Sequence, residues 1–234
     1  MITQEQLKRL NRIYEISNEE EVRRLIEEVI ALETNASKIK ESNFNIYDFA
    51  SKDKSSYQEV MTGVYHEEGW RVASDLHILI AIKDEYDEKC EGKVLRVDGS
   101  EIDTTSIGVK RYPKWKTIHP SYKDTISYKI DFSKLEEWMK IYKVHHKMMS
   151  ADERKRHTEY VQIGKSCYSL KMLYTFAKGM KYLGADSLIQ SIGEDGEKKV
   201  GYVDTEKGWA VIMPIMNLNK GITNKEEQYN VYEF

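Results

Sequence analysis

Residues 57–83 read YQEVMTGVYHEEGWRVASDLHILIAIK, and the pattern of this stretch decides the fold class. The run Ile78–Ile82 and the residues around Val72 are rich in β-forming side chains. Glu67-Glu68-Gly69 interrupts them with a turn signal, because glycine readily adopts the backbone angles of a tight turn. The stretch therefore predicts a strand, a turn and a second strand, as in an antiparallel sheet.

Helical periodicity precedes this hairpin and a connector follows it. Within residues 1–32, apolar side chains recur every three to four positions behind capping-box spacings, which predicts helices. Residues 33–56 lose this period and are expected to form a loop. Further along, Asp98-Gly99 predicts another hairpin turn. Residues 111–120, which contain two prolines, predict an extended connector at a domain boundary.

The second half predicts a strand, a helix, a linking region, a strand, a helix and three strands. Alternating apolar residues predict a strand that ends near Ile130. The next helix begins at Asp131 or Ser133, and the later helix ends at Gly184, a residue type preferred at that position. The last three strands are expected at residues 187–192, 199–204 and 209–215. The whole pattern predicts an α+β fold of antiparallel sheets with helices packed on one face.

The composition indicates a folded chain without a membrane span. Of the 234 residues, 40% are hydrophobic and 32% are charged, which is too apolar for a disordered chain. The longest apolar runs are far shorter than a bilayer requires. No secretory signal opens the sequence, and Cys90 and Cys167 form no disulfide framework, which suits a reducing compartment. We therefore expect a cytoplasmic protein with no membrane partner.

The charge of the chain is polarised, although its net value of −3 is close to neutral. Residues 1–119 hold 18 basic and 23 acidic residues and the remainder holds 18 and 16, so the two parts carry −5 and +2. Residues 133–185 alone hold eleven basic and five acidic residues, an excess of +6. Such an excess attracts acidic partners, including nucleic acid, although a solvated helical face gives the same count.

Six lysines of this basic excess are expected on the outer faces of the two predicted helices. They follow helical spacing on the two predicted helices and lie away from the apolar stripe of each helix. Because lysine is a flexible point charge, such a stripe can hold a phosphate backbone without reading bases. The six are Lys140, Lys143, Lys147, Lys171, Lys178 and Lys181.

The sequence offers no catalytic or metal-binding pattern. It contains no Walker A loop and no GxGxxG, GxSxG or HExxH motif. The adjacent His145 and His146 diverge on a helix, so they share a metal ion poorly. The segment Ser74–His77 holds a serine, an aspartate and a histidine, but neighbours on a strand point to alternating faces and form no triad. An enzyme that uses Cys167 or the histidines remains a minor alternative.

Three short motifs carry a resemblance to a known family. They are Arg71–Ile80, RVASDLHILI; Tyr112–Pro120, YPKWKTIHP; and Trp209–Ile215, WAVIMPI. In this order they resemble the V-A-T-D-G-H-R-L-A signature, the connector after the middle domain, and the last strand of the bacterial sliding clamp, the DNA polymerase III beta subunit. The resemblance covers about residues 57–216, and the predicted order of elements in residues 125–216 is similar to that of a clamp's C-terminal domain.

The resemblance implies a ring-forming processivity factor of DNA replication, with outer sheets and inner helices. The six lysines would face duplex DNA without sequence specificity, and a DNA polymerase or another protein with a clamp-binding motif would dock in a hydrophobic pocket. It implies no catalytic residue, metal or cofactor. Matched motif by motif, the pocket is lined by Ser74, Leu76, His77, Leu79, Pro120, Val211, Met213 and Pro214.

The resemblance also sets an expected domain organisation of two clamp-like domains, where family clamps have three. The expected parts are a helical N-terminal segment, 1–56, attached to a first clamp-like domain, 57–120, then a C-terminal clamp-like domain, 121–216, and a polar tail, 217–234. The glycine and arginine of the family signature are replaced by Leu76 and Ile78. Three such chains would supply the six domains of a ring, so a homo-oligomer is expected.

The alternative hypothesis is a clamp-fold protein-interaction module. Such a module would bind a partner peptide through the same pocket, without DNA and without forming a ring. A peptide-binding assay beside a DNA-binding assay separates the two hypotheses.

Overall fold

The computed structural model divides the chain into two compact units, Met1–Phe44 and Asn45–Phe234, and the elements below belong to the second unit. The structure describes residues 44–55, 59–104, 111–120, 124–156, 158–164, 166–191, 200–215 and 231–233. The helices predicted within residues 1–32 lie outside these ranges.

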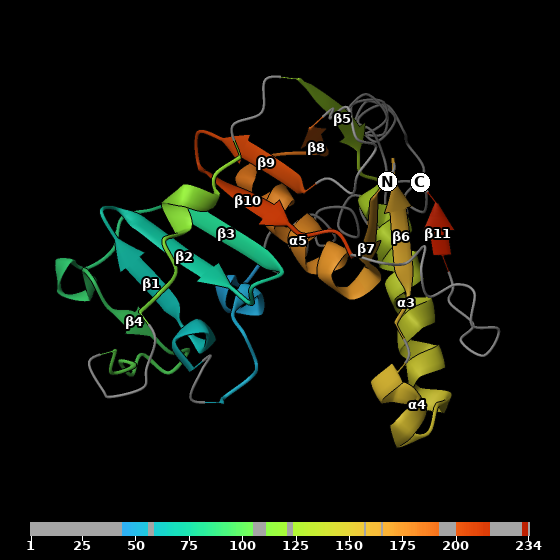
Figure 1. Cartoon of the computed structure of the whole chain (residues 1–234), viewed down its shortest axis with the longest axis horizontal. Helices are drawn as coiled ribbons and strands as arrows, with labels where there is room; N and C mark the ends of the chain where they lie inside the picture. Colours follow the sequence, from blue (N-terminus) through green and yellow to red (C-terminus); the bar gives the residue numbers. More distant parts are fainter. Residues whose placement is uncertain are drawn as a thin grey trace, which may run out of the picture. The chain divides into compact units, whose positions relative to one another are not determined.

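An antiparallel eight-stranded sheet, shown in Figure 1, forms the centre of this unit. Its order is β4-β1-β2-β3-β10-β9-β8-β5. The strands are β1 (Val64–Glu67), β2 (Trp70–Ser74), β3 (Ile78–Lys83), β4 (Val94–Leu95), β5 (Thr125–Lys129), β8 (Ser187–Ser191), β9 (Gly201–Thr205) and β10 (Gly208–Ile212). The two halves have the same strand order from edge to centre: β1, β2 and β3 follow the edge strand β4, and β8, β9 and β10 follow the edge strand β5.

The strands β3 and β10 meet in the middle of the sheet and join its halves. Leu79 pairs with Val211, and Ala81 pairs with Trp209, in an antiparallel register. One continuous sheet therefore extends across residues 57–120 and 121–216. The division of these residues into two domains stays a prediction.

The strand β3 is buried on both faces of the sheet. Successive side chains on a strand point to opposite faces, so Leu79 and Ala81 lie on one face and Ile80 on the other. Leu79 and Ala81 belong to a cluster with Trp209 and Val211, whereas Ile80 approaches a helix. This double burial explains why the sequence of β3 is a continuous apolar run instead of an alternating one.

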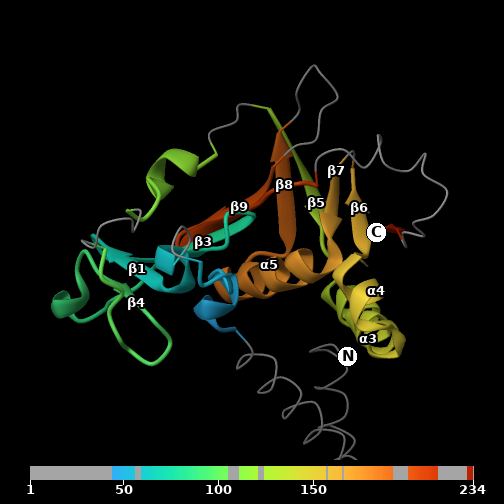
Figure 2. The ribbon, with the colours of Figure 1, turned by 60° about the horizontal axis from the view of Figure 1, so that its bottom comes forward.

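The helices α3 (Phe132–Met148) and α5 (Leu170–Leu183) lie on one face of the sheet, as Figure 2 shows for α5. The helix α5 packs on β10 and β3, with Phe176 and Met180 fully buried. Gly179 permits the close approach, because a Cβ atom there would lie 2.6 Å from the Phe49 ring and 3.0 Å from Ile80. The antiparallel sheet with helices on one face confirms the coarse α+β prediction.

The ends of both helices follow from local chemistry. Asp131 begins α3, since its carboxylate accepts hydrogen bonds from the backbone N–H groups of Ser133 (3.0 Å) and Lys134 (3.1 Å). Gly184 ends α5 with a φ of 85°, in the left-handed region that glycine adopts at little cost. Both predicted positions are confirmed.

The connector lies on the opposite face of the sheet (Figure 2). Its residues Trp115–Ile118 form a 3₁₀ turn, η4, so the prediction of a fully extended connector is wrong there. Trp115 is buried, with its ring stacked 5.9 Å from that of Trp209 and its Nε1–H donating to Glu67 over 2.9 Å. The burial of this large aromatic ring favours the turn over an extended chain.

A second, three-stranded sheet has the order β11-β6-β7. It contains β6 (Tyr160–Ile163), β7 (Ser166–Ser169) and β11 (Val231–Glu233). The single strand predicted before α5 is thus a hairpin, and the end of the predicted polar tail is a strand parallel to β6. Short helices complete the unit: η1 (Ile46–Phe49), η2 (Glu59–Thr62), η3 (Glu88–Cys90) and α4 (Ala151–Arg156).

Candidate functional site

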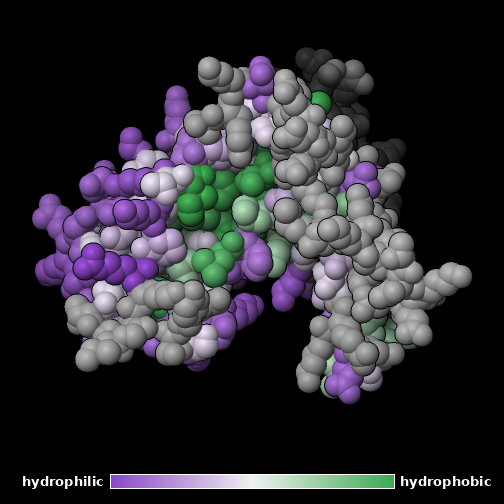
Figure 3. Space-filling model, in the orientation of Figure 1, coloured by the Kyte–Doolittle hydropathy of each residue, from purple (hydrophilic) through white to green (hydrophobic). Residues whose placement is uncertain are grey.

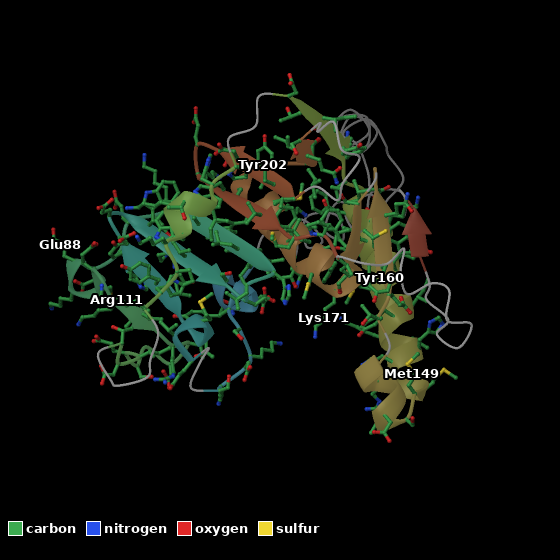
Figure 4. All side chains as sticks on the ribbon, in the orientation of Figure 1. Glu88, Arg111, Met149, Tyr160, Lys171 and Tyr202 are labelled. Carbon is green, nitrogen blue, oxygen red and sulfur yellow. The ribbon has the colours of Figure 1, made fainter. Side chains whose placement is uncertain are left out.

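The six predicted DNA-facing lysines all lie on α3 and α5. Lys140, Lys143 and Lys147 on α3 are exposed, as are Lys171 and Lys181 on α5. Lys178 is half-buried, with its ammonium group 4.8 Å from the centre of the Tyr174 ring. Within the described ranges, none of the exposed five forms an ion pair. Figure 4 marks Lys171 at the beginning of α5.

The charge of these two helices is opposite to that of the chain. The helices α3 and α5 hold seven lysines and two glutamates, which gives +5, whereas the whole chain carries −3. Everything outside them therefore sums to −8. Both helices lie on the same face of the sheet, so the positive charge of the chain is concentrated on the helical side.

The exposed apolar side chains in the second half of α3 are a feature that the sequence reasoning missed. Leu135, Trp138 and Met139 are buried, but all lie in the first half of the helix. In the second half Val144 is exposed, and Met148 is 81% exposed. Their helical spacing could have revealed this feature, but the lysines between them dominated the pattern.

The predicted pocket residues gather where β2, β3 and β10 end. Leu79 and Val211 are partners across the β3–β10 seam, and both are buried. The backbone N–H of Met213 donates to the carbonyl of His77 over 2.8 Å, which holds the segment after β10 against the β2–β3 turn. Pro120 lies at the end of the connector, outside these strands.

The exposed part of this group consists of Leu76, Met213 and the polar His77. Leu76 is 49% and Met213 45% exposed, whereas Ser74 and Pro214 are buried. Figure 3 shows a hydrophobic patch over the middle of the sheet, where β3 and β10 meet, beside a hydrophilic surface over β1 and β2. The arrangement offers apolar contact to a partner beside the exposed His77.

The segment Ser74–Ile78 forms a tight turn, and its polar side chains hold it. The Ser74 hydroxyl donates to the carbonyl of Ile78 (2.8 Å) and accepts from the N–H of Leu76 (3.0 Å). The Asp75 carboxylate accepts from the N–H groups of His77 (2.9 Å) and Ile78 (2.8 Å). The hydrogen bonds of Ser74 and Asp75 therefore stabilise the turn.

Aromatic contacts hold the connector against the sheet. The ring of His119 stands edge-on to Trp209, with centroids 4.9 Å apart, and its Nε2 lies 3.1 Å from the Asp204 carboxylate. Tyr112 stacks on Tyr65 at 4.9 Å. Burial raises the pKa of the Tyr112 hydroxyl far above its ordinary value, so it stays neutral. The connector is thereby fixed beside the strands that carry the patch.

A hollow in the surface lies near the β1–β2 turn, and none of the predicted pocket residues lines it. Its lining is Gly69, Lys83, Asp84, Glu85, Tyr86, Glu88 and Glu91. Tyr86 donates a hydrogen bond to the Glu91 carboxylate, which lowers the pKa of Glu91. Figure 4 shows Glu88 well away from Lys171, so the acidic and basic surfaces are separate.

The histidine and acidic side chains of the described residues form no metal-binding cluster. No group of three or more His, Cys, Asp or Glu side chains there could hold a metal ion. His145 lies 3.4 Å from the buried carboxylate of Glu159 and does not join His146 in a shared site. No described helix is long and apolar enough to cross a membrane.

Comparison with known proteins finds similarity among solved structures. No protein-family model and no curated protein matches this sequence. Among solved structures, the fold is similar to the chain in "Crystal Structure of Helicobacter pylori beta clamp bound to DNA ligase peptide", with 13% identity and a TM-score of 0.40. The similarity covers 73% of this chain and 61% of that clamp, so the chain spans less than two thirds of the clamp's length.

Proposed function

We propose that this protein is a clamp-like DNA tether. Its lysine-bearing helices would contact duplex DNA, and the apolar patch at the β3–β10 seam would hold a polymerase-type partner by a peptide. The proposal combines the three sequence motifs that resemble the sliding clamp with the two surfaces found on the fold. This role involves binding alone and no catalysed reaction.

The observation that carries the proposal is the concentration of positive charge on the helical face. Seven lysines and two glutamates on α3 and α5 give +5 in a chain of net charge −3. A fold that needed these lysines only for solubility would distribute them among acidic residues over all faces. Their collection on two helices that share one face favours a polyanionic partner.

The chemistry of these side chains suits non-specific contact with duplex DNA. An exposed ammonium group on a flexible stem can follow a phosphate backbone, directly or through water, without fixed geometry. Each phosphate that a lysine neutralises releases condensed counterions, so binding weakens steeply as salt rises. A protein held in this way can move along the duplex, as a processivity factor must.

The apolar patch supplies the tethering part of the proposal. Leu76 and Met213 are exposed at the end of the strand pair that holds the buried Leu79 and Val211, so an apolar side chain of a partner can displace water there, beside the exposed His77. The patch lies near the seam of the sheet, whereas the lysines lie on helices. A DNA-bound chain could therefore hold a second protein at the same time.

The test measures both ligands on the full chain. Fluorescence anisotropy is recorded with a labelled random-sequence duplex DNA and, separately, with a labelled peptide that carries a polymerase-type clamp-binding motif. The proposal expects both to bind, and expects the DNA affinity alone to fall steeply with salt. Failure to bind duplex DNA at low salt would refute the proposed role.

One observation favours the alternative of a protein-interaction module without DNA. Val144 and Met148 are exposed among the lysines of α3, and apolar side chains in that position gain nothing from a phosphate backbone. A module of this kind would bind the peptide and show no DNA affinity in the same assay. The two functions are thus separated by one pair of titrations.

A further inference from the structure

The second half of α3 carries a row of exposed apolar side chains. Ile141, Val144 and Met148 are 38%, 57% and 81% exposed, and their spacing of three and four residues places them along one side of the helix. Figure 1 shows the last turns of α3, with α4, extending beyond the strands β6 and β7. We call this row the α3 ridge. Large apolar side chains that gather on a surface are typical of a site that another molecule covers.

The spacing of the α3 ridge is that of a paired helix. In the seven-residue repeat of two packed helices, Ile141 and Met148 occupy successive a positions and Val144 the d position between them. Glu137 is at the preceding d position and α3 ends at Met148, so the ridge is about two turns long. A row this narrow fits a single helix, whereas a lipid surface requires a broader apolar face.

The charged groups beside the α3 ridge are basic. Lys140 and Lys147 occupy the two bordering g positions and are exposed, and neither forms an ion pair with another described residue. His145 occupies the e position on the other side, with its Nδ1 3.4 Å from the carboxylate of the buried Glu159. Residues at e and g of one helix face those of its partner, where opposite charges stabilise the pair. A partner helix with glutamates at these positions therefore fits the ridge.

Other occupants satisfy only part of this surface. Two α3 ridges that pair antiparallel would place lysines opposite lysines, and a parallel pair would place Lys140 opposite His145. Neither arrangement supplies an acidic group. Duplex DNA supplies negative charge, but its phosphates gain nothing from contact with Val144 and Met148. An acidic helix supplies both the charge and the apolar side chains.

We infer that the α3 ridge binds an acidic amphipathic helix of another protein. The apolar side chains of that helix pack between Ile141, Val144 and Met148, and its glutamates pair with Lys140 and Lys147. Such a contact buries less area than a standard interface, so it is weak and dissociates readily. The inference goes beyond the proposed function, because neither duplex DNA nor the patch at the β3–β10 seam uses the apolar side chains of α3.

The test uses two labelled peptides and the full chain. Both peptides repeat the heptad with Leu at a and d; one carries Glu at e and g, and the other carries Lys there. Val144→Gln with Met148→Gln removes most of the ridge, and Lys140→Glu with Lys147→Glu reverses its charge. Val97→Gln is the matched control, because Val97 is 73% exposed in a turn outside α3. Fluorescence anisotropy measures binding, and thermal unfolding checks that each variant folds.

We expect the original chain to bind the Glu peptide about five- to tenfold more tightly than the Lys peptide, because two exposed contacts change from attraction to repulsion. The Gln double variant should weaken binding of the Glu peptide by about tenfold or more, and Val97→Gln should stay within about twofold of the original chain. The Glu double variant should prefer the Lys peptide. This reversal distinguishes pairing with Lys140 and Lys147 from a general attraction to a basic surface.

The inference would be overturned if the original chain failed to bind the Glu peptide, bound both peptides equally, or bound the Glu peptide no better than its Gln double variant does. Light scattering and vesicles of phosphatidylcholine with phosphatidylserine test the other occupants. A smaller particle, or a loss of vesicle binding, in the Gln double variant would assign the ridge to a second copy or to a lipid surface, and would also overturn the inference. Duplex DNA binding is measured separately, so the proposed function is tested independently of these peptides.

Discussion

At the scale of single residues, His66 is a titratable group with little contact with water. It is 6% exposed, its Nδ1 has no hydrogen-bond partner among the described residues, and its ring meets Tyr86 edge-on at 5.0 Å. Burial lowers the pKa of His66, and the positive charge of Arg71 lowers it further. The folded protein therefore holds this imidazole neutral.

This lowered pKa predicts a loss of stability in mild acid. The unfolded chain takes up the His66 proton near pH 6.5 and the folded chain only at lower pH. The stability due to neutral His66 is complete above pH 6.5 and decreases as the pH falls toward the folded pKa. The free energy of unfolding should fall by at most about 1.4 kcal/mol per pH unit for this one proton.

Urea unfolding of the original chain and of His66→Phe between pH 7.5 and 5 measures this effect. Phenylalanine keeps a ring against Tyr86 and cannot be protonated, so the variant should show the shallower dependence on pH. Identical pH dependence in the two proteins would show that His66 does not contribute.

The turn at Asp75–His77 shows why residue patterns predict only part of this site. The hairpin turn at Glu68-Gly69 contains glycine and was predicted, but the next reversal has Leu76 at its left-handed position. The side chains of Ser74 and Asp75 form this turn by hydrogen bonding to the backbone. A serine or an aspartate next to a strand does not by itself predict such a turn. The sequence therefore predicted one hairpin where the structure has three strands.

At the scale of elements, the packing of α5 on the sheet depends on a missing side chain. Gly179 lies inside α5, where glycine costs about 1 kcal/mol relative to alanine in helix propensity. Its position is explained by Phe49 of η1 and by Ile80, which approach too closely for a Cβ atom. Tertiary packing thus determines this residue against its local preference.

We predict that Gly179→Ala lowers the free energy of unfolding by about 1–3 kcal/mol, because the methyl group overpacks a buried site. Chemical denaturation measures the change. In the double variant Gly179→Ala with Phe49→Leu, the smaller side chain leaves room, so the two effects should be clearly non-additive. Additive losses, or a more stable Gly179→Ala, would show that the contact does not constrain the helix.

Most strands and both long helices could be predicted because their signals are local. Asp131 caps the start of α3 and Gly184 ends α5, and each acts on backbone groups only a few residues away. The continuous apolar run of β3 is likewise contained within six residues. The β3–β10 seam and the parallel pairing of β11 with β6 join residues far apart in sequence, so no local pattern contains them. The 3₁₀ turn at Trp115 likewise depends on the distant Trp209.

The same distinction applies to the candidate site. The lysines could be placed on α3 and α5 because helical spacing fixes the face on which a residue lies. Seven of the eight predicted pocket residues gather where β2 and β10 end and β3 begins, but only the three-dimensional arrangement shows that Leu76, His77 and Met213 are exposed whereas Leu79 and Val211 are buried. Exposure depends on neighbours that are distant in the sequence.

At the scale of the whole molecule, the proposed function requires either a ring of several chains around the duplex or one chain that binds along its side. A chain of 27.4 kDa that formed a three-membered ring would give a particle of three times that mass. We predict this trimer in light scattering at tens of micromolar protein. A particle with the mass of one chain would exclude a simple ring and restrict the protein to binding along one side of the duplex.

The most direct test of the account is the salt dependence of duplex DNA binding. The decisive variant carries Glu at Lys140, Lys143, Lys171 and Lys181, all exposed, and the control carries Glu at the exposed Lys52, Lys83, Lys89 and Lys207, away from α3 and α5. If the helices contact phosphates, the slope of log Kobs against log salt should become shallower by about 3–4 in the first variant. The control should keep a slope close to that of the original chain. An unchanged slope in the first variant would contradict the claim that this helical face binds DNA.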